Sequence, residues 1–213
     1  MHYRPLSIAG AWEITPQTFA DDRGTFLEWF KDNEFVDVVG HALDLRQANL
    51  SVSRAGVVRG IHFADVPPGQ AKYVTCPSGA VLDVVVDVRA GSPTFGAWEA
   101  VLLDDLERRA VYVSEGLGHA FVALADASTV MYLCSTGYNP TGEHGIDPLD
   151  PALGIPWEEL DPRLEGRELV LSDKDRGAPT LAGALEQGLL PRWDAVMSFV
   201  AEQRQRHDER AGR

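Results

Sequence analysis

The sequence predicts one mainly all-β domain, built as a sandwich or barrel, and three observations support this. Short segments rich in β-branched residues follow one another closely, with turn residues between most of them. Alternating strand and helix patterns are missing, which argues against a parallel, doubly wound sheet. The length of 213 residues suits a single domain with a large core and room for a small appendage.

The predicted elements begin with a short helix and continue as a series of strands. The helix is expected at 32–39. Val81–Val88 has the clearest strand pattern, since it is rich in valine and lies between Ser78-Gly79 and Gly91-Ser92-Pro93. The other expected strands are 57–63, 70–76, 97–103, 109–113, 119–125 and 128–134. Their close spacing, with turn residues between most of them, favours a sandwich or barrel.

The C-terminal part has a different pattern. After about residue 139 the chain is rich in Pro, Gly and Asp, with brief apolar islands, which indicates irregular chain wrapped on the barrel. Apolar residues at helical spacing then predict helix over roughly 179–207, divided by Pro191. The polar end, 203–213, is expected to fray. We therefore expect a barrel with wrapping N- and C-terminal segments over 1–178 and a C-terminal helical extension over 179–213.

Composition excludes several classes of protein. A formal net charge of −13 argues against nucleic acid as a partner, because nucleic-acid binding needs a broad basic surface, but two or three local cations suffice for a small anion. The N-terminus has no long apolar segment, and no run approaches the length of a membrane span. Cys76 and Cys134 lie in apolar, strand-like segments, so we expect buried free thiols and a cytoplasmic protein.

Common catalytic motifs are absent from the sequence. It contains neither G-x-G-x-x-G nor G-x-x-x-x-G-K-[ST], so nucleotide binding at a helix N-terminus is not indicated. The hydrolase motif G-x-S-x-G is missing too. A metal site is the main competitor, with His62 and His119 as candidate ligands, but two imidazoles fall short of the three protein ligands usual at a catalytic zinc. We expect no metal and no cofactor.

The most informative residues are a histidine, a lysine and a tyrosine on separate strand-like segments. His62 and Lys72 are ten residues apart, and Tyr132 lies sixty residues further on. Such a set can remove a proton, hold an enolate and return a proton. A single histidine or tyrosine in a strand is more often a structural residue than a catalytic one, and this applies to His62 and Tyr132 taken singly. His119, which follows two glycines, fits a turn as well as a site. The combination favours a proton-transfer site.

Strand geometry adds three expectations. Arg59 and His62 have opposite parity in an ideal strand, so Gly60 must allow a bulge if both serve one pocket. Lys72 lies in an apolar strand, where an unpaired ammonium is costly, so an anion or a developing negative charge should face it. Asp83 and Asp87 share a parity, and we expect both to face solvent or a cation.

Several longer segments, in this order and spacing, carry a resemblance to a known family. They are Asp22–Glu28 (DRGTFLE), Gln47–Ser51 (QANLS), Val58–Phe63 (VRGIHF), Ala71–Val74 (AKYV), Asp87–Gly96 (DVRAGSPTFG), Gly116–Phe121 (GLGHAF), Met131–Cys134 (MYLC), Tyr138–Pro140 (YNP) and Leu171–Asp175 (LSDKD). Over about residues 3–193 the chain resembles the dTDP-4-dehydrorhamnose 3,5-epimerase family, and actinobacterial members especially. The resemblance implies a cupin-type double-stranded β-barrel (jelly roll) that works as a homodimer without metal or cofactor.

The resemblance also implies roles for single residues. His62 matches the base, oriented by Asp175, and Tyr132 matches the acid on the opposite face of the sugar. Lys72 matches the cation beside the C4 oxygen. The positions that match substrate-binding residues are Arg23, Phe26, Glu28, Gln47, Asn49, Arg59, His119 and Tyr138. The substrate implied is a dTDP-4-keto-6-deoxyhexose.

The expected reaction inverts C3 and C5, and the sequence leaves alternatives open. Relatives that invert only C3 or only C5 can keep the same histidine and tyrosine, and a metal-free cupin could also be a 3,4-ketoisomerase or a non-catalytic sugar-nucleotide binder. The chain departs from the family at Gly145–Pro148, at Ile155-Pro156-Trp157 and in a longer tail. These departures affect expectations for dimer packing and tail contacts, and leave the proton chemistry untouched.

Overall fold

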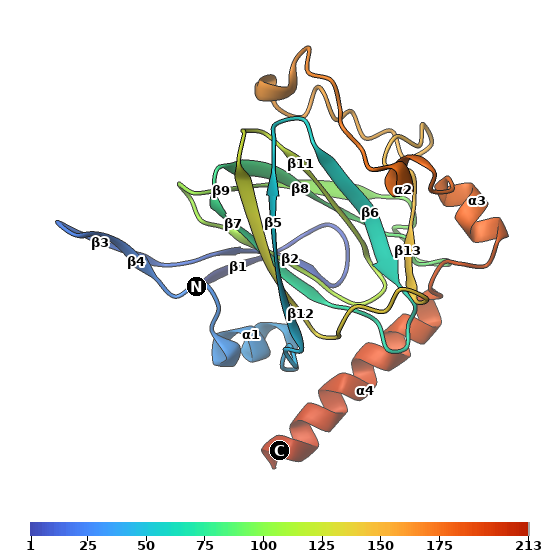
Figure 1. The fold of residues 1–213 in the computed structure, drawn as a ribbon. Coiled ribbons are helices and arrows are strands. Elements are labelled where there is room, and N and C mark those ends of the chain that lie inside the picture. The colour runs from blue at the N-terminus through green and yellow to red at the C-terminus, as the bar shows by residue number, and fades with distance from the viewer. Residues whose placement is uncertain (213) are drawn as a thin grey trace.

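The computed structural model describes residues 1–212 and forms two β-sheets packed face to face (Figure 1). Within this range, one sheet has six strands in the order β1-β2-β10-β7-β12-β5, and the other has five in the order β13-β6-β11-β8-β9. The neighbouring named strands pair antiparallel. The predicted mainly β, double-stranded barrel is confirmed.

The bounds of the elements are as follows. The six-stranded sheet contains β1 (His2–Pro5), β2 (Ala11–Thr15), β5 (Gln47–Ser53), β7 (Lys72–Ser78), β10 (Ala110–Val113) and β12 (Ser128–Cys134). The five-stranded sheet contains β6 (Val58–Ala64), β8 (Ala80–Val86), β9 (Trp98–Asp104), β11 (Gly118–Ala123) and β13 (Glu143–Gly145). A separate hairpin consists of β3 (Thr18–Asp21) and β4 (Gly24–Leu27). The helices are α1 (Asp32–Val39), α2 (Asp173–Arg176), α3 (Leu181–Glu186) and α4 (Trp193–Ala211), with a 3₁₀ turn at Pro162–Leu164.

Three apolar layers pack against the two sheets. The inner layer lies between the sheets and includes Val74 and Val130 from one and Val85 and Phe121 from the other. The outer face of the five-stranded sheet is covered by apolar residues of the irregular segment after β13, such as Trp157. On the outer face of the six-stranded sheet, α1 packs its apolar residues against the strands. Side chains along each strand point alternately to the inner and the outer layer, which fixes the face on which each polar side chain lies.

The sequence-based strand boundaries are close to those in the structure from residue 58 onward. The helix at 32–39 and the strand at 128–134 are confirmed to the residue. Six strands outside the predicted set are β1 to β5 and β13. β1 to β4 and β13 have only three to five residues each, too few for a clear apolar alternation. β5 does alternate polar and apolar residues over seven positions, and the prediction missed it.

The C-terminal segment forms two helices, as predicted, with Pro191 between α3 and α4. The expected fraying of 203–213 is wrong for the described residues, because α4 continues as a helix to Ala211, while Arg213 lies outside the described part of the chain. Contacts with the barrel support it, including a hydrogen bond from Gln203 Nε2 to Glu115 Oε1 of 2.8 Å. The division of the chain at residue 178 stays a prediction.

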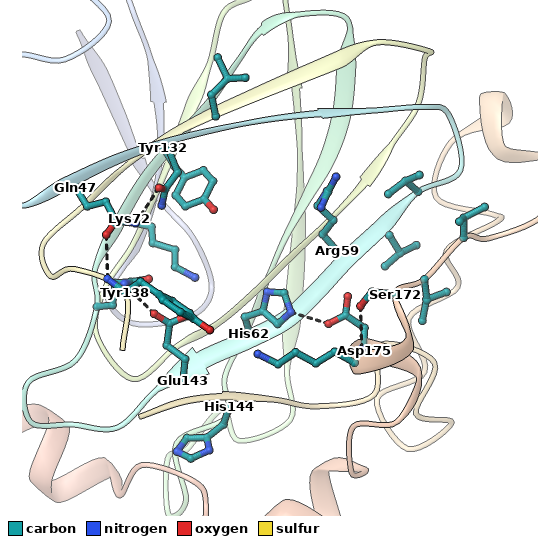
Figure 2. Close-up of a pocket in the computed structure, with 18 residues that line it drawn as sticks. Gln47, Arg59, His62, Lys72, Tyr132, Tyr138, Glu143, His144, Ser172 and Asp175 are labelled. Carbon is teal, nitrogen blue, oxygen red and sulfur yellow. Dashed lines mark hydrogen bonds and ion pairs between the residues drawn. The ribbon is translucent and has the colours of Figure 1, made fainter. Parts of the chain in front are cut away.

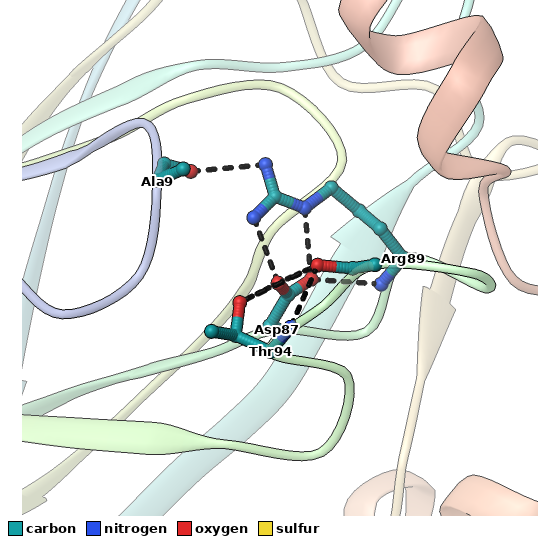
Figure 3. A network of polar contacts seen from close by, with 5 residues as sticks. Ala9, Asp87, Arg89 and Thr94 are labelled. Carbon is teal, nitrogen blue, oxygen red and sulfur yellow. Dashed lines mark hydrogen bonds and ion pairs between the residues drawn. The ribbon is translucent and has the colours of Figure 1, made fainter.

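A buried ion pair joins Asp87 and Arg89 at one edge of the barrel (Figure 3). Asp87 accepts hydrogen bonds from Arg89 at Nε and Nη2, both 2.8 Å, and from the hydroxyl of Thr94. Arg89 also donates to the carbonyl of Ala9, and its guanidinium lies 4.6 Å from the ring centre of Trp193. Because every charged group here has a partner, the cluster fastens the N-terminal loop and α4 to one edge of the barrel.

The expectation for Asp83 and Asp87 is partly wrong. Both carboxylates are fully buried, so neither faces solvent. Asp87 does face a cation, Arg89, whereas Asp83 pairs with His119. The predicted buried free thiols, Cys76 and Cys134, are confirmed. Among the described residues, none of the helices has both the length and the apolar character needed to cross a membrane.

Candidate active site

A cavity of about 650 Å³ opens between the two sheets, beside α2 (Figure 2). Strands from both sheets contribute to it, together with the segment just before α2. The lining residues discussed below are Gln47, Asn49, Arg59, His62, Gln70, Lys72, Tyr132, Tyr138, Glu143, His144, Ser172, Lys174 and Asp175. Its volume lies within the range of small-molecule pockets, about 300–1,000 Å³.

Strand register explains why four polar side chains of the six-stranded sheet reach this cavity. Tyr132 lies opposite Asn49 on β5, and Cys134 lies opposite both Gln47 on β5 and Lys72 on β7. Residues two apart in a strand share a face, so all of them point to the inner side of the sheet. The sheet therefore presents a row of polar groups where the inner apolar layer ends.

A bulge in β6 brings Arg59 and His62 to the same face. In the pairing with β11, His62 lies opposite His119 and Arg59 lies opposite Phe121, so three steps on β6 match two on β11. Gly60 sits in the extra step with a φ of +120°. The predicted bulge at Gly60 is confirmed, and both side chains line the cavity.

The space around Gly60 makes a substitution there informative. A Cβ at this position would lie 2.6 Å from the Cβ of Ala120 and 2.6 Å from the carbonyl of His119. We expect Gly60→Ala to lower the free energy of unfolding by about 2–5 kcal/mol, from the positive φ together with overpacking, and to reduce activity by displacing His62. Thermal melts and kcat measure both effects.

Gly91→Ala is the matched control for this substitution. Gly91 also has a positive φ, of +86°, but a Cβ there would meet nothing within 4 Å. The control isolates the backbone penalty from the steric one, so it should cost less stability and leave kcat unchanged. Equal losses in the two variants would contradict a steric role for Gly60.

The imidazole of His62 is held by a carboxylate from a distant part of the chain. His62 Nε2 lies 2.7 Å from Asp175 Oδ1, and Figure 2 shows Asp175 reaching it from α2. Ser172 is the N-cap residue of α2, and its hydroxyl accepts a hydrogen bond from the backbone N–H of Asp175. This hydrogen bond stabilises the start of the short helix. If Nε2–H donates to Asp175, then Nδ1 is the basic nitrogen.

Asp175 is kept ionised by its neighbours. Burial acts to raise its pKa, but hydrogen bonding to His62, the charge of a protonated His62 and hydrogen bonds from Ser172 and the backbone of Gly60 outweigh burial and lower the pKa. Only 6% of the Asp175 side chain is exposed, against 37% for His62, so the carboxylate is screened while the imidazole faces the cavity. An ionised Asp175 accepts a hydrogen bond from the imidazole of His62 and so fixes the orientation of the ring.

Lys72 and Tyr132 lie on the other side of the cavity from Asp175. Figure 2 shows the Lys72 ammonium between the Tyr132 ring and the His62 imidazole. Burial lowers the pKa of Lys72, an effect that nearby Cys134, Glu143 and Asp83 oppose. Burial, reinforced by Cys134, raises the pKa of Tyr132, which keeps the phenol protonated. The arrangement offers a base, a cation and an acid around one space.

The family model for dTDP-4-dehydrorhamnose 3,5-epimerase matches residues 5–183. The chain belongs to this family. It is 60% identical to the dTDP-4-dehydrorhamnose 3,5-epimerase of Mycolicibacterium smegmatis over 200 residues, which cover 94% of this chain and 96% of that one. The resemblance seen in the sequence is confirmed, and with it the assignment to an isomerase family.

Solved structures agree with the fold of this epimerase-family chain. The rmlC epimerase of Mycobacterium tuberculosis has a TM-score of 0.91 and 56% identity, and the match covers 95% of this chain and all of that one. A 3'-monoepimerase from Streptomyces bikiniensis, in complex with dTDP-quinovose, has a TM-score of 0.90 and 50% identity, with 96% and 100% covered. The rmlC epimerase and the 3'-monoepimerase are thus similar in fold to this chain to nearly the same degree.

Eight of the site residues that were expected from the sequence line the cavity. They are Gln47, Asn49, Arg59, His62, Lys72, Tyr132, Tyr138 and Asp175. Gln47 accepts a hydrogen bond from the backbone N–H of Tyr138, 2.9 Å long, and donates to Asn49. Arg59 donates to the hydroxyl of Ser53 at 3.1 Å. Their roles toward a substrate stay predictions.

His119 lies behind the main cavity of the epimerase chain. Its Nε2 is 2.7 Å from Asp83 Oδ2, and the ring is buried. It shares a much smaller hollow with His62 and Lys72. Within residues 1–212, no three His, Cys, Asp or Glu side chains are grouped closely enough to hold a metal ion.

Three of the expected site residues do not line the cavity of this chain. Arg23 lies between the strands of the β3–β4 hairpin, Phe26 lies on β4 and Glu28 follows it. Figure 1 shows this hairpin extending away from the barrel. Arg23 pairs with Asp21 of the same hairpin, and Glu28 is 3.4 Å from Lys31.

The prediction of site residues missed several polar side chains. Glu143 on β13 lines the cavity, and its Oε1 accepts from the backbone N–H of Asn139 and, at 3.4 Å, from Gln70. His144 and Lys174 line it as well. β13 is only three residues long, so no strand pattern marks it in the sequence.

Proposed function

We propose that this chain inverts C3 and C5 of dTDP-4-dehydro-6-deoxy-D-glucose, giving dTDP-4-dehydro-β-L-rhamnose. The observation that carries the proposal is the His62–Asp175 pair facing Tyr132 across a cavity, with Lys72 between them. The curated relatives in Mycolicibacterium smegmatis and Mycobacterium tuberculosis are named as 3,5-epimerases and support it.

Proton removal is assigned to His62. C3 and C5 both flank the C4 ketone, so loss of either C–H proton gives an enolate at the ketone oxygen. His62 accepts the proton at Nδ1, and Asp175 stabilises the imidazolium that forms. General-base catalysis of this kind contributes about 10²–10⁴ to the rate.

Lys72 and Tyr132 complete the reaction. The Lys72 ammonium stabilises the negative charge that develops on the C4 oxygen, a charge absent from the ground state. Tyr132 returns a proton to the opposite face of the carbon, and inversion follows because base and acid lie on different sides of the ring. The raised pKa of Tyr132 suits a group that must be protonated before it donates.

The pocket also needs cations for the diphosphate of the substrate. The protein as a whole carries −13, which opposes the approach of an anion. Arg59 and Lys174 line the cavity and provide local positive charge. The planar donor fork of Arg59 suits a phosphate oxygen pair.

We further propose that the active form is a cytoplasmic homodimer in which each pocket receives Arg23 of the partner subunit. The β3–β4 hairpin is exposed on nearly all positions, with Phe19 and Phe26 49% and 66% exposed. An isolated two-stranded hairpin is marginally stable in water, so a second surface is expected to cover it. Edge strand β5 exposes Leu50 and Val52 beside the cavity, which offers that surface.

Proton NMR of the substrate in D₂O tests the proposed reaction. Double epimerisation exchanges both ring protons that flank the ketone, so we expect deuterium at C3 and at C5. Deuterium at C3 alone would identify a 3-epimerase, the activity for which the relatives from Streptomyces niveus and Streptomyces bikiniensis are named. A ketone moved to C3 would identify a ketoisomerase, and no exchange at all a binding protein.

Tyr132→Phe separates the two proton transfers. The substitution leaves His62 and Lys72 in place, so the first deprotonation should still occur. Solvent exchange is then expected to outpace formation of inverted product in the same D₂O assay. A Tyr132→Phe enzyme that forms product at the rate of the unchanged protein would remove Tyr132 from the mechanism.

A further inference from the structure

Ser53 ends a row of polar side chains on the inner face of β5. Gln47, Asn49, Ser51 and Ser53 alternate with exposed residues along this strand, so all four side chains lie on one face. Gln47 and Asn49 line the catalytic cavity. Ser53 lies at the far end of the row, where it is only 4% exposed and pairs in register with Ser128 of β12. A hydroxyl buried to this degree needs a hydrogen-bond partner.

The partner of Ser53 is Arg59, which comes from the other sheet. The chain passes from β5 to β6 between the two residues. Arg59 Nε donates a hydrogen bond to Ser53 Oγ at 3.1 Å. The Arg59 side chain is exposed, and Figure 2 shows it on the same wall of the catalytic cavity as His62. The hydrogen bond therefore ties a long, exposed side chain of the cavity to a buried atom of the opposite sheet.

The position of this hydrogen bond leaves the rest of the guanidinium free. Within residues 1–212, Arg59 makes no other side-chain hydrogen bond and no ion pair with a carboxylate. Arg23 and Arg89, by contrast, are each bound to an aspartate. A guanidinium carries five N–H groups in one plane, and Ser53 uses only the one at Nε. Both terminal amino groups of Arg59 thus remain available as a fork for two phosphate oxygens.

A neutral acceptor suits this place better than a carboxylate. A carboxylate at position 53 would compete with phosphate oxygens for the guanidinium and cancel its charge, on a protein that already carries −13. The hydroxyl of Ser53 accepts from Nε without adding charge, so Arg59 keeps its full positive charge toward the cavity. The hydrogen bond also restricts the rotamers of Arg59 before a ligand arrives, which lowers the entropy that binding must remove.

From these contacts we infer that Ser53 is a positioning residue, which holds the Arg59 guanidinium ready for the diphosphate of a nucleoside-diphosphate sugar. Ser53 does not line the cavity itself, so it acts only through Arg59. The inference rests on the proposed function for the identity of the ligand. It assigns to Ser53 a contribution to substrate binding and none to proton transfer.

Calorimetric titration of the full-length protein with dTDP tests this inference, because dTDP carries the diphosphate and undergoes no epimerisation. Ser53→Ala should weaken dTDP binding about three- to tenfold, the size expected for one lost hydrogen bond and a freed arginine side chain. KM should rise by a similar factor while kcat stays within about twofold, since the contact is the same in the ground state and the transition state. A serine with a purely structural role would lower the melting temperature and leave dTDP affinity unchanged, and that result would overturn the inference.

Ser51→Ala is the matched control for this substitution. It removes the same group from the same face of β5, and Ser51 Oγ has no hydrogen-bond partner within residues 1–212. The control should leave dTDP affinity and kcat unchanged. Equal losses of affinity in the two variants would show a general effect on the strand and contradict a specific role for Ser53.

A double-mutant cycle with Arg59→Met shows whether Ser53 acts through Arg59. Methionine has a long unbranched side chain without an N–H group, and position 59 is exposed, so folding is retained. In the Arg59→Met background, Ser53→Ala should have no further effect on dTDP affinity, and an undiminished effect there would overturn the inference. Failure of the proposed function gives a different result, namely a protein that binds dTDP but exchanges no substrate proton in D₂O. The cycle with dTDP then still decides the role of Ser53, because it needs no turnover.

Discussion

His62→Asn is expected to lower kcat by about 10²–10⁴-fold or more. Among the described residues 1–212, His62 is the only base in the cavity that Asp175 orients, and the substitution removes it. Asparagine keeps a polar side chain of similar reach but accepts no proton near neutral pH. Substrate affinity should change much less than kcat, since the imidazole acts in the transition state. Steady-state kinetics with coupled reduction of the product measures both constants.

His144→Asn is the matched control for that loss. His144 lines the same cavity from β13, and its Nε2 is 2.8 Å from Asp65, so it too is an imidazole paired with a carboxylate. Asp65 is much more exposed than Asp175, with 53% of its side chain accessible against 6%. We expect His144→Asn to leave kcat within a few-fold. If the two variants lost activity equally, the base would not be His62 alone.

Local sequence pattern was enough to predict the central strands but not the outer ones. β8 is valine-rich and buried on both faces, and its pattern is plain in the sequence. β3 and β4 are exposed throughout most of their length, so their sequences carry no apolar alternation. They form a hairpin that extends from the barrel, and what stabilises it lies outside the local sequence.

The candidate site needed information that local pattern does not contain. His62 and Asp175 are 113 residues apart, and only the resemblance to a family linked them before the structure placed them 2.7 Å apart. The bulge at Gly60, by contrast, followed from parity once Arg59 and His62 were assigned to one pocket, since two residues three apart cannot otherwise share a face. Parity also grouped Asp83 with Asp87, but it could not reveal that Asp83 pairs with a buried histidine.

Arg23→Ala is expected to raise KM strongly, with a smaller effect on kcat, because it removes a diphosphate contact present in both the ground state and the transition state. In the single chain, the Arg23 side chain is 90% exposed and bonds to Asp21 at the hairpin turn, away from the cavity of its own barrel. A large rise in KM from such an exposed residue requires a second subunit. An unchanged KM would exclude Arg23 from the site.

Mixing Arg23→Ala with His62→Ala decides whether the pocket is shared. If Arg23 of the partner subunit completes each pocket, a heterodimer has one pocket with both residues intact and one with neither. The assay uses a substrate concentration far below the raised KM of Arg23→Ala, where the homodimers of both variants are nearly inactive. Random exchange of equal amounts makes half of the dimers mixed, so activity should recover to about a quarter of that of the unchanged enzyme. Subunit exchange is verified with two affinity tags. Verified exchange without recovery would place Arg23 and His62 in the same subunit's pocket, because a heterodimer would then contain no complete site.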